Sequence, residues 1–278
     1  MYPTLFTLGG VHIASFSIFL ILGWCVFSFV FWKSLRDDGV LEERIFDLTF
    51  YATTAGLVVA RAWYVLIHWG NFSGSLIKIP ALWVAPGMSL MAGVIAGLLV
   101  MLSIAKRMKI RLGTVVDAVG LALPGALIVG SIGSLLDGGS LGRVAGVPWA
   151  IRYVGLPELR HPYPIYMAAT LVIILLVMGF VSERAKSWKW PLGLPGLLFF
   201  FLWSIGIFVL EYVRESDVYW YTVSAQGWEA LVLFFGVVGV WYAYCGGKFI
   251  VRERVHKVKE TCMHGSRYIY AKFPKRHA

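Results

Sequence analysis

Residues 46–69 read FDLTFYATTAGLVVARAWYVLIHW, and this stretch decides the fold class. It is apolar over most of its length and, as a helix, is long enough to cross the roughly 30 Å of hydrocarbon in a bilayer. Arg61 lies inside it. An arginine within a membrane is costly unless it faces protein or water, and such a residue usually serves a function. The stretch therefore predicts a membrane-spanning helix with a candidate functional residue.

The composition of the whole chain agrees with this prediction. Of its 278 residues, 59% are hydrophobic and 14% are charged, whereas a soluble domain carries about 25% charged residues. We therefore expect an integral membrane protein. Cys25, Cys245 and Cys262 show neither paired spacing nor a zinc-binding pattern, so we expect no disulfide framework, no metal site and no cofactor.

Seven apolar runs approach the roughly 20 residues that a transmembrane helix needs. They are residues 11–32, 46–69, 88–105, 114–136, 163–181, 194–213 and 227–244. The first run has no Lys or Arg before it and no small-residue cleavage site after it, so we expect it to be retained rather than removed as a signal peptide. The predicted fold class is all-α, a polytopic membrane protein with seven transmembrane helices.

Positive charge is distributed unevenly among the connecting segments. Segments 33–45, 106–113 and 182–193 and the tail from Lys248 are richer in Lys and Arg than the alternate segments. The positive-inside rule then places the N-terminus outside and the C-terminus in the cytoplasm, in agreement with an odd number of spans. We expect a membrane domain over residues 1–247 and a basic cytoplasmic tail over residues 248–278. The tail is expected to contact anionic lipid headgroups in preference to nucleic acid.

Arg61 lies in the outer half of its predicted span. Tyr64 and His68 follow at three and seven residues, so the three side chains are expected on one helical face. In one interpretation, Arg61 extends to the outer interface beside an aromatic belt of Trp63 and Trp69. In the other, which the polar residues on its own face favour, Arg61 lines a cavity.

Other ionisable residues lie near the same predicted face of the membrane. Glu211 and Arg214 end the sixth run with an i,i+3 spacing, so either they pair with each other or Glu211 pairs with the more distant Arg61. His161 lies at the outer start of the fifth run. It is either an amphipathic anchor at the interface or a group that transfers protons near neutral pH.

The segment DGGSLGR, residues 137–143, lies on this face as well. Its glycines allow close backbone approach, and Arg143 can bind a phosphate or carboxylate through two N–H groups. The alternative is an ordinary turn between helices. Three arginines, a glutamate and a histidine at one membrane face together suit an anionic lipid headgroup, with guanidinium groups binding its phosphate.

Five motifs occur in order along nearly the whole chain. They are VARAWY (59–64), PGMSLMAG (86–93), GSIGSLLDGGSLGR (130–143), RHPYPIY (160–166) and FVLEYVRESD (208–217). In order and spacing they resemble the motifs of the prolipoprotein diacylglyceryl transferase family, seven-span enzymes of the bacterial inner membrane. The positions that match in residue type are Arg61, Tyr64, Gly142, Arg143, His161, Tyr166, Glu211 and Arg214.

The chain departs from the family pattern at several polar positions. The resemblance leads us to expect a histidine at Met91, arginines at Ser131 and Ile207, and an asparagine at Ser134. These replacements remove polar groups, while the apolar scaffold is kept.

The resemblance implies transfer of a diacylglyceryl group from phosphatidylglycerol to a lipobox cysteine thiol, with glycerol phosphate as the leaving group. Met91 cannot act as a base, so His161 would take that part, with Glu211 as the second catalytic residue. The lipid phosphate would be bound by Arg61, Tyr64, Gly142, Arg143 and Arg214. The implied partners are phosphatidylglycerol and a preprolipoprotein signal peptide, without a cofactor or nucleic acid, and the implied location is the bacterial cytoplasmic membrane.

Three interpretations follow from the matches and the departures. The chain is a divergent transferase with reduced or altered activity, a non-catalytic relative that binds lipid or a lipoprotein precursor, or a related transferase for another lipid. The matching Arg61, Arg143 and Glu211 favour the first interpretation. The replacements at Ser131 and Ser134 favour the other two. We favour membership of the transferase family.

Overall fold

The computed structural model describes residues 4–8, 11–82, 84–185 and 187–244. The chain divides into two compact units, residues 1–234 and residues 235–278. Each unit is a body of its own, and every contact described below lies within the first. The predicted basic tail, residues 248–278, lies outside the described residues.

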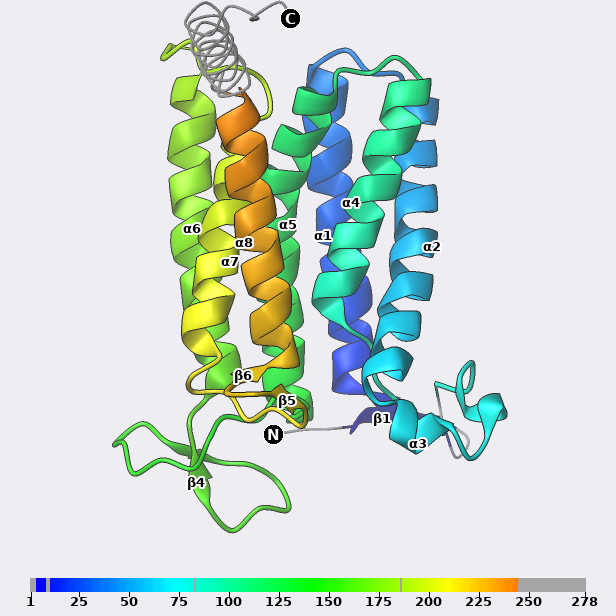
Figure 1. Ribbon diagram of the computed structural model, residues 1–278, viewed down its shortest axis with the longest axis vertical. Helices are drawn as coiled ribbons and strands as arrows, with labels where there is room; N and C mark the ends of the chain where they lie inside the picture. The colour runs from blue at the N-terminus through cyan, green and yellow to red at the C-terminus, as the bar shows by residue number, and fades with distance from the viewer. Residues whose placement is uncertain (1–3, 9–10, 83, 186, 245–278) are drawn as a thin grey trace, which may run out of the picture. The chain divides into compact units, whose positions relative to one another are not determined.

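Long apolar helices make up most of the described chain (Figure 1). They are α1 (Ser15–Asp37), α2 (Glu42–Ile67), α4 (Leu90–Arg107), α5 (Leu112–Asp137), α6 (Tyr163–Ala185), α7 (Leu194–Leu210) and α8 (Ala225–Tyr244). Each of the predicted apolar runs overlaps one of them. Among the described residues, six helices are long and apolar enough to cross a membrane, and α7 is apolar but has 17 residues.

The connections also contain short helices and antiparallel β-hairpins, so the fold is mostly helical and not strictly all-α. The short helices are α3 (Trp69–Phe72) and the 3-10 turn η1 (Leu76–Lys78). The hairpins pair β1 (Thr4–Leu8) with β2 (Val11–Ala14), β3 (Ile151–Arg152) with β4 (Leu159–Arg160), and β5 (Tyr219–Trp220) with β6 (Val223–Ser224).

Helix ends differ from the predicted runs by up to five residues, as at the starts of α1 and α2 and the ends of α1, α6 and α7. Residues 11–14 belong to the first apolar run but form β2, because residues 4–8 supply an antiparallel partner strand, and α1 begins only at Ser15. The sixth run extends to residue 213, whereas α7 ends at Leu210 and continues as a turn. Hydropathy does not register these ends, since strands and turns of apolar residues score like helices.

Within the first unit, the connections alternate between the two ends of the helices (Figure 1). The α1–α2, α4–α5 and α6–α7 connections lie at one end, and these are the segments rich in Lys and Arg. Segments 68–82, 84–89, 138–162 and 211–224 lie at the other end. The candidate site residues that belong to connections lie in these segments.

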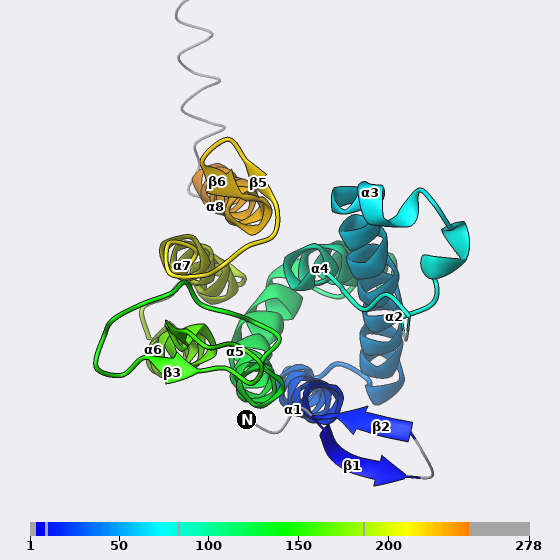
Figure 2. The same cartoon turned by 90° about the horizontal axis from the view of Figure 1, so that it is seen from below.

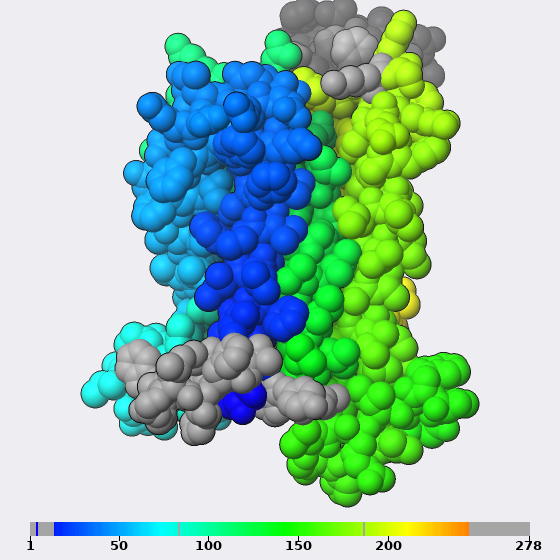
Figure 3. All heavy atoms as spheres, turned by 180° about the vertical axis from the view of Figure 1, so that it is seen from behind, coloured from blue at the N-terminus to red at the C-terminus, as the bar shows by residue number. Residues whose placement is uncertain are grey.

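The helices of the first unit pack in pairs, with α1 against α5, α2 against α4, and α5 also against α6 and α7 (Figure 2). The helices α1, α5 and α6 lie next to one another and form one outer face of the first unit (Figure 3). Ile21, Phe29, Ile173 and Leu176 are 61% to 69% exposed. Large apolar side chains that face outward on long helices suit contact with lipid. With six helices long and apolar enough to cross a membrane among the described residues, the chain is a multi-pass membrane protein.

A carboxylate within α5 fixes the start of α7. Asp117 accepts hydrogen bonds from the backbone N–H groups of Gly193 (2.7 Å) and Gly196 (2.8 Å). The first N–H groups of a helix lack partners within the helix, and the positive end of the helix dipole favours an anion there. Asp117 therefore caps α7 and ties it to α5.

We expect Asp117→Asn to destabilise the fold. The amide keeps one acceptor oxygen but turns an NH₂ group toward the other N–H, so one charge-assisted hydrogen bond is lost at a cost of roughly 1.5–3 kcal/mol. Thermal unfolding in detergent should show a midpoint several degrees lower. Asp37→Asn, at the exposed end of α1, is the matched control and should leave the midpoint unchanged. Equal midpoints for both variants would contradict the capping role.

Candidate functional site

Arg61 on α2 is enclosed by the segment that connects α3 to α4. Its Nε donates a hydrogen bond to the carbonyl of Ile79 (2.7 Å), and its two terminal nitrogens donate to the carbonyls of Gly87 and Lys78 (2.8 Å each). The residue is 7% exposed. Hydrogen bonds from an ionised donor are stronger than neutral ones. The guanidinium therefore ties this connecting segment to the end of α2.

Aromatic rings surround the same guanidinium. The Cζ atom of Arg61 lies 5.1 Å from the ring centroid of Phe72 and 5.9 Å from that of Tyr64. The Tyr64 ring stacks on His68 with centroids 4.1 Å apart. As predicted, Tyr64 on α2 and His68 at its C-terminal cap lie on the Arg61 face of the helix. The side chain is held by protein and does not extend to the outer surface.

Gly87 fits against this cluster because it lacks a side chain. Its φ of 139° is a conformation that favours glycine, and a Cβ there would lie 2.2 Å from the Tyr64 ring. Two residues later, the N–H of Ser89 donates to the carbonyl of Ala60 (3.0 Å). The Ser89 hydroxyl accepts from the N–H of Ala92 (3.3 Å) and caps α4. Arg61 and Gly87 thus determine where α4 begins.

A second cluster forms where α5, α6 and α7 end or begin at the same end of the first unit. The N–H of Arg143 donates to the carbonyl of Val213 (2.9 Å), and the N–H of His161 donates to the carbonyl of Arg143 (3.0 Å). Gly142 forms an antiparallel bridge with Arg214. The Nε of Arg143 donates to the carbonyl of Arg214 (3.1 Å). Backbone pairing therefore brings three predicted site segments together.

Gly142 lies at the tightest point of this pairing, since a Cβ there would lie 2.1 Å from the carbonyl oxygen of His161. The buried Arg160 fixes the same loop. It donates to the carbonyl of Gly142 (3.3 Å) and forms ion pairs with Glu158 and Glu215. Arg160 was not among the predicted site residues, although it precedes His161 in its motif. An arginine beside a membrane interface gives no sequence signal that separates this role from an exposed charge.

Glu211 and Arg214 pair with each other, as one of the two sequence interpretations predicts. The Oε2 atom of Glu211 lies 3.6 Å from a terminal nitrogen of Arg214. The Arg214 guanidinium lies over the ring of Tyr163, with 5.6 Å from Cζ to the centroid. Oε2 of Glu211 and Nε of Arg214 are buried and have no hydrogen-bond partner within the described part of the chain. Unsatisfied buried groups are uncommon, and this pair retains polar capacity for a ligand.

His161 lies at the edge of this cluster. Its Nδ1 is 3.1 Å from the hydroxyl of Tyr166, which also accepts a hydrogen bond from the Trp149 indole (2.6 Å). The hydroxyl of Tyr153 donates to the carbonyls of His161 and Ser140 (3.4 Å each). Burial raises the pKa of Tyr153 to about 12, so this hydroxyl remains a neutral donor at physiological pH.

Glu229, in the first turns of α8, connects the two clusters and was not predicted. Its carboxylate accepts hydrogen bonds from the Trp63 indole of α2 and from the Ser89 hydroxyl (3.2 and 3.3 Å to the two oxygens). It also interacts electrostatically with Arg214 and Glu211. The signal was available: Glu229 is an ionisable residue inside an apolar run, the criterion that singled out Arg61.

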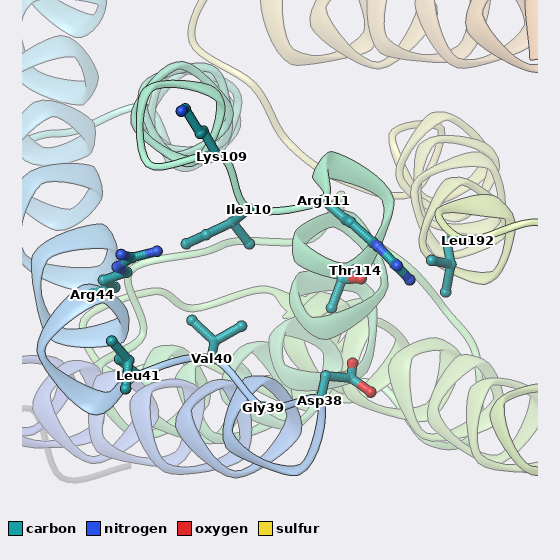
Figure 4. A pocket seen from close by; sticks show the side chains of 10 residues that line it. All are labelled: Asp38, Gly39, Val40, Leu41, Arg44, Lys109, Ile110, Arg111, Thr114 and Leu192. Atoms are coloured by element: carbon teal, nitrogen blue, oxygen red, sulfur yellow. The ribbon is translucent and has the colours of Figure 1, made fainter.

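A basic cavity of about 430 Å³ lies at the other end of the first unit, between the α1–α2 and α4–α5 connections (Figure 4). Its lining includes Asp38, Arg44, Lys109 and Arg111, and Arg111 extends toward Leu192. These are charges of the Lys- and Arg-rich segments, remote from the clusters above. Within residues 4–8, 11–82, 84–185 and 187–244, no group of His, Cys, Asp and Glu could hold a metal ion.

Residues 3–243 match the model of the family described as prolipoprotein diacylglyceryl transferase. The chain belongs to this family. The phosphatidylglycerol–prolipoprotein diacylglyceryl transferase of Aeromonas salmonicida (strain A449) is 30% identical over 254 residues, which cover 87% of this chain and 90% of the relative. The enzymes of the same name from Aeromonas hydrophila subsp. hydrophila and Vibrio atlanticus (strain LGP32) are 28% and 29% identical. They cover 87% and 77% of this chain and 90% and 79% of their own lengths. The family resemblance inferred from the motifs is confirmed.

Three of the positions where this member departs from the motif pattern, Met91, Ile207 and Ser131, have buried side chains. Met91 and Ile207 are 1% and 2% exposed. The Ser131 hydroxyl donates to the carbonyl of Leu127 within α5 (2.8 Å). Ser134 lies one turn along the same helix. Met91 and Ile207 thus belong to the packed interior, and Ser131 keeps a buried hydroxyl.

We expect Arg61→Ala to loosen the segment that Arg61 holds. The variant leaves the carbonyls of Lys78, Ile79 and Gly87 without their donors, and hydrogen bonds to charged groups contribute about 1.5–3 kcal/mol each. Hydrogen exchange followed by mass spectrometry should show faster exchange in peptides covering residues 76–82 and 84–89. Arg44→Ala is the control, because Arg44 also donates to a backbone carbonyl, that of Met108. Unchanged exchange in those peptides would contradict this role of Arg61.

Proposed function

We propose that the chain transfers the diacylglyceryl group of phosphatidylglycerol to the thiol of a lipobox cysteine in a preprolipoprotein. Family membership and the names of the relatives support this reaction. The observation that carries it is the second cluster, in which Arg143, His161, Glu211 and Arg214 meet around the side-chain-free Gly142. Two guanidinium groups and a carboxylate on segments joined by backbone pairing suit a phosphate ester that must be bound and then released.

The proposed setting is the bacterial cytoplasmic membrane, with all seven helices spanning it, the N-terminus outside and the C-terminus in the cytoplasm. The 17 residues of α7 extend about 25 Å as a helix, close to the hydrocarbon thickness. The Lys- and Arg-rich connections lie at the end opposite to the site, which favours a site on the outer side. Residues 1–247 would form the membrane domain, and residues 248–278 would contact anionic headgroups of the cytoplasmic leaflet.

The lipid phosphate is assigned to Arg143 and Arg214. Arg143 is exposed, its Nε donates to the carbonyl of Arg214, and one terminal nitrogen donates to the hydroxyl of Tyr219 (3.3 Å). The other terminal nitrogen is assigned to the phosphate. Arg214 is held by Glu211 and has a buried Nε available to a ligand oxygen. As the glycerol phosphate departs, negative charge on its oxygens increases, and fixed guanidinium donors stabilise that charge.

Arg61 and Tyr64 are assigned to the same lipid from the other side. Three of the five N–H groups of a guanidinium are used by the carbonyls around Arg61, and the remaining two are assigned to the phosphate. Tyr64 supports the Arg61 guanidinium and the close approach of Gly87. His161 and Glu211 are the residues assigned to catalysis in the second cluster.

The reaction forms one bond and breaks one bond. The thiol sulfur attacks the glycerol carbon that bears the phosphate, a carbon–sulfur bond forms, and the carbon–oxygen bond to phosphate breaks. Glycerol phosphate leaves, and the thiol proton is released. The protein must therefore supply cations for the leaving phosphate and a proton acceptor for the thiol.

The purified chain in phosphatidylglycerol vesicles should attach a diacylglyceryl thioether to a lipobox peptide, detected by mass spectrometry. The Aeromonas salmonicida relative serves as the positive control. No product from this chain while the relative is active would contradict the proposed function. Phosphatidylglycerol that still binds in that case, and is released by Arg143→Ala, would favour the non-catalytic interpretation that the packed Met91, Ser131 and Ile207 suggest.

Arg143→Ala should lower the transfer rate by about 10²–10³, the usual effect of removing one donor from a developing anion. Arg152→Ala is the matched control, since Arg152 is an exposed arginine of β3 in the same outer segment. We expect that variant to transfer at a rate close to that of the unmodified chain. A similar decrease in both variants would show that the segment's total charge, rather than Arg143, matters.

A further inference from the structure

Glu229 has a half-buried carboxylate, and the proposed function gives this residue no role. It lies in the first turns of α8, and its two oxygens receive hydrogen bonds from α2 through Trp63 and from the start of α4 through Ser89. We propose that Glu229 is the proton acceptor for the attacking thiol. This proposal rests on the proposed function and assigns one of its steps.

The step needs a base, and Met91 occupies the motif position at which the resemblance leads us to expect one. A cysteine thiol has a pKa of about 8.5, and only the thiolate is the nucleophile. Met91 has no basic atom and is packed into the core. Glu229 reaches the same helix start, because its hydrogen-bond partner Ser89 precedes Met91 by two residues. A carboxylate from α8 thus lies beside the helix turn where the family motif would have a base.

The geometry around Glu229 fixes the carboxylate and leaves it capacity to accept a proton. The Ser89 hydroxyl lies within hydrogen-bond distance of both oxygens, and the Trp63 indole donates to one of them. A carboxylate has about four acceptor positions, so two donors do not saturate it. The residue is half-buried. Preorganised groups of this kind lower a barrier without reorganising during the reaction.

The charges near Glu229 connect it to the proposed phosphate site. Arg214 and Glu211 interact with it electrostatically, and Arg214 is one of the residues assigned to the phosphate. A thiol between Glu229 and a phosphate on Arg214 and Arg143 would have its base and its leaving group on opposite sides. That arrangement suits displacement at the glycerol carbon, which lies between the thiol sulfur and the phosphate.

The proton and electrons balance as follows. Glu229 takes the thiol proton as the carbon–sulfur bond forms, and the electrons of the broken carbon–oxygen bond stay on the glycerol phosphate. The protonated Glu229 then returns its proton to the departing phosphate or to water, which restores the carboxylate. The Nδ1 atom of His161 lies 3.1 Å from the Tyr166 hydroxyl. In this proposal His161 acts on the departing glycerol phosphate and not on the thiol.

The test compares two lipobox peptides, one with cysteine and one with selenocysteine, under reducing conditions in phosphatidylglycerol vesicles. A selenol is ionised at neutral pH and needs no base. Glu229→Gln keeps an acceptor for Trp63 or Ser89 but cannot take a proton. We expect its rate with the thiol peptide to fall by about 10²–10⁴, the usual contribution of a general base. Its rate with the selenol peptide should stay within about threefold of the unmodified chain.

Each other outcome overturns the proposal in a distinguishable way. Equal losses with both peptides would mean that Glu229 only holds α2, α4 and α8 in place. An undiminished thiol rate in Glu229→Gln would mean that another group accepts the proton. An unmodified chain that reacts with neither peptide would refute the proposed function together with this step. Glu183→Gln, an exposed glutamate on α6, is the matched control and should leave both rates unchanged.

Discussion

The hydrogen bonds from the Arg61 guanidinium to three backbone carbonyls are the constraint on which the first half of the site depends. A charge near the end of a transmembrane helix must be satisfied by protein or water, and here the chain itself supplies the acceptors. Those bonds place Gly87 against Tyr64, and Ser89 then begins α4. Ser89 also donates a hydrogen bond to Glu229. The segment that Arg61 holds therefore contacts a carboxylate on α8.

The second cluster is organised by backbone pairing instead of by a central cation. Arg143 sits between the segments of Val213 and His161, and the pairing passes through Gly142, where a side chain would collide with a carbonyl. Backbone hydrogen bonds join these segments and the Arg160 side chain holds the same loop, so Arg214 keeps a buried Nε for a ligand. The two clusters are thus built by different means, and Glu229 is in contact with one and electrostatically coupled to the other.

Much of the fold followed from the sequence because the helices are defined by hydropathy alone. Each predicted apolar run overlaps a helix, and the motif order led to the correct family. The Glu211–Arg214 pair was one of two predicted partnerships, since i,i+3 spacing specifies it locally. The partners of Arg61 were not predictable in the same way. They are backbone carbonyls of a connecting segment, and a carbonyl carries no residue-type signal. Glu229 was overlooked although its position in an apolar run marked it, because no neighbour in sequence indicates that Trp63 and Ser89 meet it.

The central claim is that Arg143 and Arg214 bind the phosphate of phosphatidylglycerol. Locating that phosphate in the protein tests the claim most directly. An electron cryo-microscopy structure in nanodiscs of phosphatidylglycerol would locate that phosphate. We predict phosphate density within hydrogen-bond distance of Arg143 and Arg214, at the end of the helices that carries residues 138–162. Phosphate density found instead in the basic cavity lined by Arg44, Lys109 and Arg111, with none near Arg143, would contradict the account.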